Sequence, residues 1–140
     1  MNVRYFDNAA TTRVKDEVLE EMLPYLKEKF GNPSSMYTIG REAKKAIENA
    51  RERVAKLINC KANEIYFTGS GSESDNTAIK GIAHKRAFKG KHIITSKIEH
   101  PAVLHTCQSL EREGFKVTYL NVNKDGIVDI NQLINSIRND

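Results

Sequence analysis

The chain has 140 residues, with 22 Lys or Arg against 18 Asp or Glu, so its net charge is only +4 at neutral pH. This length suits one domain with a buried core, and its basic residues alternate with acidic ones without neighbouring aromatic clusters, which argues against nucleic-acid binding. Because the sequence also lacks a signal peptide, an apolar membrane span, and a cysteine spacing typical of disulfide frameworks or metal sites, we expect a soluble cytoplasmic protein.

The first part of the chain is predicted to form two helices. Apolar residues recur with helical spacing over residues 15–30, where Pro24 predicts a kink or a break, and again over residues 38–58. Between them, residues 31–35 read Gly-Asn-Pro-Ser-Ser, which is the composition of a turn. We expect residues from about 1 to 60 to form an N-terminal arm and helices.

From Glu64 onward the pattern changes to alternating strands and helices. Strands are predicted at 65–68, 92–96 and 116–120, and helices at 73–88, 101–113 and 130–137. This order with short connections predicts an α/β fold with a parallel sheet covered by helices. We therefore expect residues from about 61 to 140 to form the first βαβαβ part of a larger domain, because three strands are few for such a sheet.

The loop of residues 68–72 carries the strongest chemical signal. It joins a predicted strand to a helix, so it directs unpaired backbone N–H groups and the positive end of the helix dipole at one place. We expect an anion site, most simply for a phosphate, formed by the amides of Gly71, Ser72 and Glu73 and by the Ser72 hydroxyl. Without a ligand the same residues indicate only a capped helix, with Ser72 as the N-cap and Asp75 three residues on. The loop alone does not decide between these interpretations.

A second candidate, His100, follows the strand at 92–96 and precedes Pro101. Ligands of parallel α/β sheets bind at the C-terminal ends of the strands, so we expect His100 and residues 68–72 to face one crevice. There an imidazole can stack on a planar cofactor and exchange protons near neutral pH. For the remaining histidines and for Cys60 and Cys107 we expect structural or incidental roles.

Four segments together resemble the NifS/IscS-type cysteine desulfurases, which are pyridoxal-phosphate (PLP) enzymes of the class V aminotransferase group. These segments are 6–12, 30–35, 67–76 and 92–100, and they occur in the family's order along the whole chain. The resemblance implies the N-terminal part of the large domain of a fold-type I PLP-dependent transferase, with three α/β/α layers and a mainly parallel sheet. One departure is Tyr37, where the family commonly has His.

The resemblance also implies roles for individual residues. Gly71 and Ser72 align with the pair that holds the PLP phosphate, and His100 aligns with the histidine that stacks on the PLP ring and serves as an acid/base. The implied reaction converts L-cysteine to L-alanine and passes sulfur as a persulfide to an acceptor, such as an iron-sulfur scaffold protein. In the family, the lysine that binds PLP and the catalytic cysteine lie downstream of the matched region. We therefore expect the 140-residue chain alone to be inactive, and a homodimer is implied for the full-length protein.

Three other functions stay open on the sequence alone. Another class V aminotransferase or a selenocysteine lyase would share these segments, and the downstream cysteine loop would separate them from a desulfurase. A non-catalytic fragment could act as a binding or interaction module. Nucleotide binding by the Gly/Ser loop is the least favoured, since the loop is neither a Walker A motif nor a complete dinucleotide-binding fingerprint.

Overall fold

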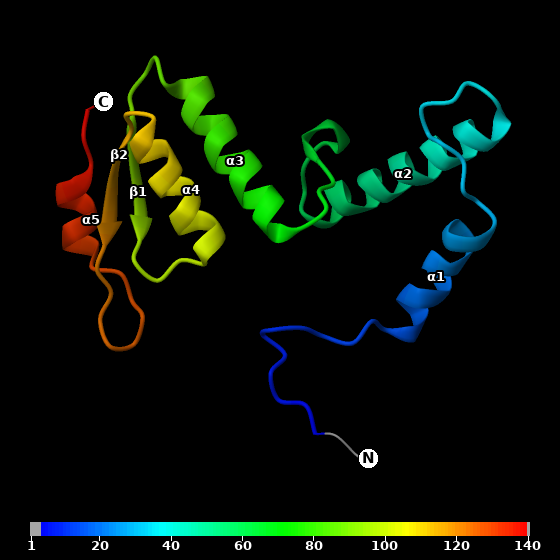
Figure 1. Ribbon diagram of the computed structural model, residues 1–140, viewed down its shortest axis with the longest axis horizontal. Coiled ribbons are helices and arrows are strands. Elements are labelled where there is room, and N and C mark those ends of the chain that lie inside the picture. The colour runs from blue at the N-terminus through cyan, green and yellow to red at the C-terminus, as the bar shows by residue number, and fades with distance from the viewer. Residues whose placement is uncertain (1–3, 140) are drawn as a thin grey trace. The chain divides into compact units, whose positions relative to one another are not determined.

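The computed structural model describes residues 4–139 and divides into two compact units, one ending at Tyr66 and the other beginning at Phe67. Figure 1 labels their elements, and each unit is considered by itself. Unit 1 contains α1 (Asp16–Lys27), α2 (Thr38–Leu57) and the 3₁₀ helix η1 (Ala62–Glu64). Unit 2 contains α3 (Gly71–Arg86), β1 (His92–Ser96), α4 (Pro101–Arg112), β2 (Lys116–Leu120) and α5 (Ile130–Ser136).

Helix α1 continues through Pro24, so the chain does not break there. The helix ends three residues later at Lys27. The carbonyl oxygen of Pro24 accepts hydrogen bonds from the amides of Glu28 at 2.9 Å and Lys29 at 2.8 Å, which close the last turn. Proline lacks an N–H donor, but its carbonyl can still accept hydrogen bonds and end the helix in this way.

The Gly-Asn-Pro-Ser-Ser segment forms a turn that folds back on the start of α2. The Asn32 side chain accepts a hydrogen bond from the Ser34 amide at 2.9 Å, and the Asn32 carbonyl accepts one from the Ser35 amide at 3.0 Å. A Cβ atom at Gly40 would lie 2.5 Å from the Ser35 carbonyl oxygen. The close contact between turn and helix therefore requires glycine at position 40.

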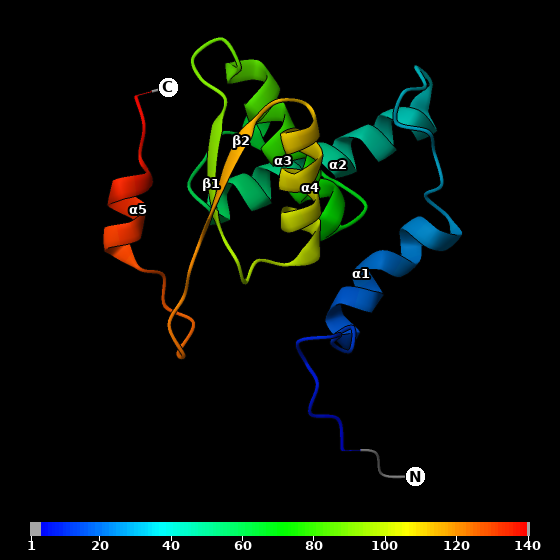
Figure 2. The ribbon, with the colours of Figure 1, turned by 60° about the vertical axis from the view of Figure 1, so that its left-hand side comes forward.

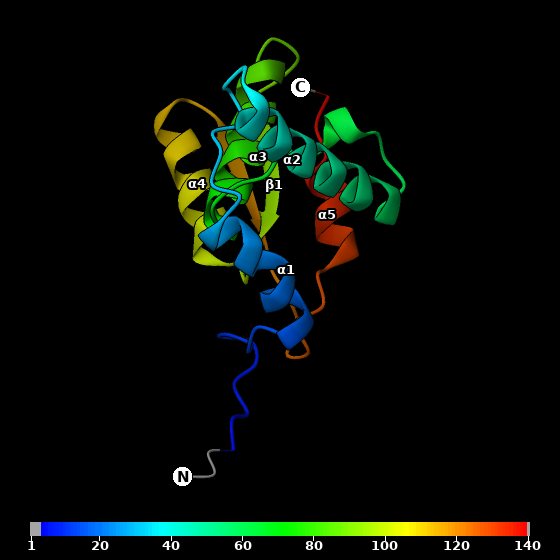
Figure 3. The same ribbon diagram turned by 90° about the vertical axis from the view of Figure 1, so that its right-hand side faces the viewer.

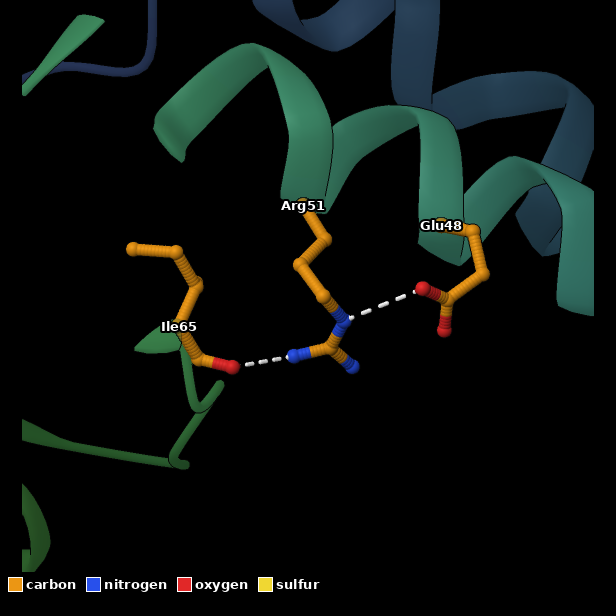
Figure 4. Close-up of polar contacts among 3 residues, drawn as sticks. All are labelled: Glu48, Arg51 and Ile65. Atoms are coloured by element: carbon orange, nitrogen blue, oxygen red, sulfur yellow. Dashed lines mark hydrogen bonds and ion pairs between the residues drawn. The ribbon is translucent and has the colours of Figure 1, made fainter. Parts of the chain in front are cut away.

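Arg51 connects α2 to the residue that follows η1, as Figure 4 shows. Its guanidinium donates to the carbonyl oxygen of Ile65 and pairs with the carboxylate of Glu48, with 3.4 Å between Nε and Oε2. Ile65 is held in an extended conformation with φ −96° and ψ 129°.

The predicted strand at residues 65–68 does not form. The backbone begins extended, yet the segment pairs with no strand in the described part of the chain, and its side chains Tyr66 and Phe67 are exposed. A strand needs an inter-strand ladder of hydrogen bonds, and here the Ile65 carbonyl is taken by Arg51 instead. The prediction of a β-strand was therefore wrong, because extended conformation is local whereas pairing is not.

Unit 2 is built around two parallel strands, which confirms the predicted parallel arrangement. β1 and β2 occupy the predicted ranges, with His92 opposite Lys116 and Ser96 opposite Leu120. Helix α4 packs against β2, α3 packs against α4, and α5 contacts β2. Figure 2 and Figure 3 show α4 and α5 on opposite sides of the sheet, so unit 2 has an α/β/α layering.

The helix boundaries follow the sequence pattern closely except in α1, which was predicted over residues 15–30 and ends three residues earlier, at Lys27. The ranges predicted for α2, α4 and α5 agree with the structure to within one residue, whereas α3 begins and ends two residues earlier than predicted. At the end of α4, Gly114 has φ +89° and the Phe115 amide donates to the Leu110 carbonyl at 3.0 Å. This glycine-dependent cap turns the chain from α4 into β2. Over residues 4–139, each helix is too short or too polar to cross a membrane.

Candidate functional site

The Gly/Ser loop enters α3 with Ser70 as the N-cap. The Ser70 hydroxyl accepts a hydrogen bond from the Glu73 amide at 3.2 Å, and the Glu73 carboxylate accepts one from the Gly69 amide at 2.7 Å. The prediction of Ser72 as the cap was wrong because Ser70 and Glu73 have the spacing of a capping box, and the long Glu73 side chain reaches back past the cap.

This cap determines which of the N–H and O–H groups that were expected to bind an anion are still available. The Glu73 amide is used by Ser70, so it cannot serve as predicted. The amides of Gly71 and Ser72 belong to the first turn of α3, where no helical acceptor exists. Ser72 is exposed, and a Cβ atom at Gly71 would meet nothing within 4 Å. Two amides and one hydroxyl therefore border open space at the positive end of a helix.

Hydrogen bonds within the loop hold these donors in place. The Thr68 hydroxyl lies 2.6 Å from the Ser74 hydroxyl and donates to the Ser70 carbonyl at 3.1 Å. Glu73 brings one negative charge into the loop, where its carboxylate is bonded to the amide of Gly69. An anion bound at Gly71 and Ser72 would be repelled by that carboxylate and attracted by the helix dipole.

Residues 96–100 form a braced turn at the C-terminal end of β1. The hydroxyl of Ser96, which is buried, donates to the Glu99 carboxylate at 3.0 Å. The Lys97 amide donates to the Leu120 carbonyl at 3.0 Å and so extends the pairing with β2 beyond Ser96. Both bonds fix the backbone that leads to His100. The Ser96–Glu99 contact was not predicted, and the Ser-x-x-Glu spacing, shared with Ser70 and Glu73, is the signal that could have indicated it.

His100 is the N-cap of α4. Its ring atom Nδ1 accepts a hydrogen bond from the Ala102 amide at 3.1 Å, and Pro101 occupies the first helical position. The side chain is exposed. The hydrogen bond from Ala102 therefore fixes the orientation of the His100 ring relative to α4.

The two candidate segments lie at one end of unit 2. Figure 1 shows the N-terminal ends of α3 and α4 at the end toward which β1 and β2 run. Ligands of parallel α/β sheets bind at this end. That Ser72 and His100 face one crevice stays a prediction.

The two cysteines lie outside these segments and are not joined by a disulfide. Cys107, on α4, is 1% exposed, and burial raises the pKa of its thiol, with further contributions from the carboxylates of Glu111 and Glu99. A raised pKa favours the thiol over the nucleophilic thiolate. This environment agrees with a structural role for Cys107.

Comparison with known proteins places these features in context. A sequence model of the family described as aminotransferase class-V matches residues 4–140. The chain is 59% identical over 133 residues to "Cysteine desulfurase IscS" of Clostridium botulinum strain Hall, a match that covers 95% of this chain and 34% of that protein. The chain thus spans about a third of the length of this curated relative.

Two solved structures are also similar to the chain. One is described as "NIFS-LIKE PROTEIN", with a TM-score of 0.92 and 45% identity, over 97% of this chain and 37% of that one. The other is described as "SspA in complex with cysteine", with a TM-score of 0.89 and 45% identity, over 97% of this chain and 39% of that one. Both matches support the α/β fold that the sequence predicts.

We predict that Ser70 and Ser72 differ in their effects on stability. Replacing the cap in Ser70→Ala is expected to lower the free energy of unfolding by about 0.5–2 kcal/mol. Ser72→Ala removes an exposed hydroxyl and is expected to change it by less than about 0.5 kcal/mol. Urea unfolding followed by circular dichroism measures both. The reverse order of effects would place the cap at Ser72.

We also predict that Cys107 resists thiol reagents in the folded chain. In a Cys60→Ser variant, modification by an aromatic disulfide reagent near pH 8 is expected to be slow in buffer and fast in urea. Unfolding removes the burial and the nearby carboxylates that raise the pKa of Cys107, so it increases the thiolate fraction. Equal rates in both solvents would contradict the buried environment.

Proposed function

Because this chain belongs to the class-V aminotransferase family, we propose that it is the N-terminal portion of a PLP-dependent cysteine desulfurase. The strongest support is the 59% identity to a curated cysteine desulfurase over nearly the whole chain. In this proposal residues from about 1 to 60 are the N-terminal arm and helices. Residues from about 61 to 140 begin the large PLP-binding domain.

The Gly/Ser loop fits the phosphate group of PLP. The amides of Gly71 and Ser72 and the Ser72 hydroxyl would bind it, and the positive end of α3 would favour its charge. The open space beside Gly71 leaves room for an anion close to the backbone. When bound, PLP supplies an electron sink for charge that develops on the substrate carbon.

His100 is proposed to lie against the PLP ring and to act on the substrate. Its exposure at the end of β1 and its fixed ring orientation support this assignment. Helices α3 and α4 begin at the same end of unit 2, and this supports a single site that contains both His100 and Ser72.

The proposed substrate is L-cysteine, and the proposed products are L-alanine and a persulfide. The C–S bond of cysteine breaks, a proton is added to the resulting carbon, and the sulfur joins the thiolate of a catalytic cysteine. A sulfur-acceptor or iron-sulfur scaffold protein would then receive the sulfur. The solved structure of SspA is described as a complex with cysteine, which supports this substrate class. We propose a cytoplasmic homodimer for the full-length protein.

Another class V aminotransferase or a selenocysteine lyase is the second candidate, because both would share the family and the fold. The desulfurase assignment is favoured because the curated relatives in Clostridium botulinum and Methanosarcina thermophila carry that description at 59% and 60% identity. A non-catalytic binding module is a third candidate for the 140-residue chain by itself.

We predict that Ser72 contributes directly to PLP binding in the complete protein. Ser72→Ala is expected to weaken the affinity for PLP by about 10- to 150-fold, the value of one hydrogen bond to a charged group. Ser72→Thr keeps the hydroxyl and is the matched control, with affinity close to that of the parent. Titration of the PLP-free protein, followed by absorbance, measures all three. Equal affinities for the Ala and Thr variants would contradict the assignment of the hydroxyl.

We predict that the purified 140-residue chain forms no alanine from cysteine, because none of its lysines and cysteines lies in the sequence context of the family's PLP-binding lysine or catalytic cysteine. The assay supplies PLP and L-cysteine and measures alanine and sulfide by chromatography and colorimetry. The complete protein serves as the positive control. Alanine production by the short chain would favour a different catalytic arrangement.

A further inference from the structure

We propose that Asn123 is a positioning residue. Its side chain shapes the tip of the loop between β2 and α5, and this tip supports Ile98 in the turn that leads from β1 into α4. The support of the turn concerns the fold of unit 2 alone. Its consequence for catalysis rests on the function proposed above, because residues 96–100 lie at the end of unit 2 where the ligand is proposed to bind.

The loop of residues 121–129 is closed by hydrogen bonds at its base. An isolated antiparallel bridge joins Val122 to Val128. The Asn121 amide donates to the side-chain oxygen of Gln132, on α5, at 2.7 Å. The base of the loop is therefore tied both to itself and to the helix that follows it.

Asn123 organises the tip of this loop with its backbone and its side chain. Its Oδ1 atom accepts hydrogen bonds from the amides of Asp125 at 2.9 Å and Ile127 at 3.0 Å. Its own amide donates to the Ile127 carbonyl at 2.9 Å, and its carbonyl accepts from the Gly126 amide at 3.1 Å. Asparagine is favoured in turns because its side chain can take backbone hydrogen bonds in this way. Two of these four bonds are lost if position 123 has no side-chain acceptor.

Gly126 brings the tip of the loop against the turn after β1. It has φ +79°, a left-handed conformation that suits glycine, and a Cβ atom placed on it would lie 3.7 Å from Cδ1 of Ile98. The end of the Ile98 side chain therefore lies beside the loop tip. Ile98 remains 61% exposed, so the tip supports this side chain on one side and does not bury it. Figure 1 shows the loop and the turn at the same end of unit 2.

A backbone hydrogen bond ties the same turn to the end of β2. The Lys97 amide donates to the Leu120 carbonyl at 3.0 Å, and Leu120 directly precedes the loop. A change in the loop can therefore reach the turn by two routes, through the side chain of Ile98 and through the backbone at Leu120. We expect the Lys97 hydrogen bond to loosen when the tip loses its shape.

The test uses variants of the complete protein on both sides of the contact. Asn123→Ala removes the acceptor, whereas Asn123→Asp keeps an oxygen at Oδ1 and is the matched control. Lys124→Ala changes an exposed side chain of the same tip and controls for the general effect of a substitution there. Ile98→Ala removes the contact from the other side and leaves the loop unchanged, so it tests the support even if Asn123→Ala does not fold.

Hydrogen exchange in the PLP-free protein, resolved to single amides by mass spectrometry, measures the support. The Ile127 amide is expected to exchange about 2- to 12-fold faster in Asn123→Ala, the value of one hydrogen bond, and at the parent rate in Asn123→Asp and Lys124→Ala. The Lys97 amide is expected to exchange faster in both Asn123→Ala and Ile98→Ala. The double variant is expected to add little to either single change, because both remove the same support.

Steady-state kinetics of alanine production from cysteine measures the consequence for the reaction. In Asn123→Ala and Ile98→Ala, kcat is expected to fall by at least about threefold and by up to about 100-fold, the effect of a misplacement of about 1 Å. The affinity for PLP is expected to stay close to that of the parent, because Gly71 and Ser72 belong to a different loop. Asn123→Asp is expected to keep the parent kcat.

The outcomes distinguish failure of this inference from failure of the proposed function. If Lys97 exchanges at the parent rate in both Asn123→Ala and Ile98→Ala, the support of the turn is overturned. If its exchange is faster but kcat is unchanged, or if the affinity for PLP falls together with kcat, the positioning role in the reaction is overturned. If the complete protein forms no alanine from cysteine, the proposed desulfurase function fails, while the exchange data still decide the support of the turn.

Discussion

Unit 2 depends on the burial of one face of α4 against the parallel strands. Leu110 and Cys107 are almost completely removed from solvent, and Phe115 and Leu120 complete the same core. Two parallel strands cannot be joined by a tight turn, so a crossover helix must pack on the sheet for them to pair. Helix α4 packs on β2 in this way, and its N-terminus, with His100 as the cap, lies at the C-terminal ends of the strands.

The two candidate segments cap the start of a helix in related ways. Each one connects an extended segment to a helix and leaves N–H groups that need acceptors. In the first, Ser70 and Glu73 supply the acceptors, and in the second, His100 caps the helix while Glu99 accepts from Ser96. The Glu73 amide is bonded to Ser70, so the donors that remain for a ligand at the start of α3 are the amides of Gly71 and Ser72 and the Ser72 hydroxyl.

Local signals in the sequence predicted most of unit 2. The strands at 92–96 and 116–120 have the predicted bounds because short apolar runs are enclosed by turn and cap residues on both sides. The segment at 65–68 has similar composition but pairs with no strand among residues 4–139, and pairing depends on residues far away in the sequence. The spacing of Ser70 and Glu73 in the sequence could have indicated Ser70 as the cap, whereas the bond of the Glu73 carboxylate to the Gly69 amide depends on the reach of that side chain. The acceptor role of His100 Nδ1 required the backbone geometry of α4.

The short sequence separation of the paired strands has a kinetic consequence. β1 and β2 are register partners from His92 and Lys116 onward, and only α4 and its turns lie between the two strands. Closing so short a loop costs little chain entropy, and folds with low contact order form quickly. The β1–α4–β2 segment can therefore assemble as soon as it leaves the ribosome.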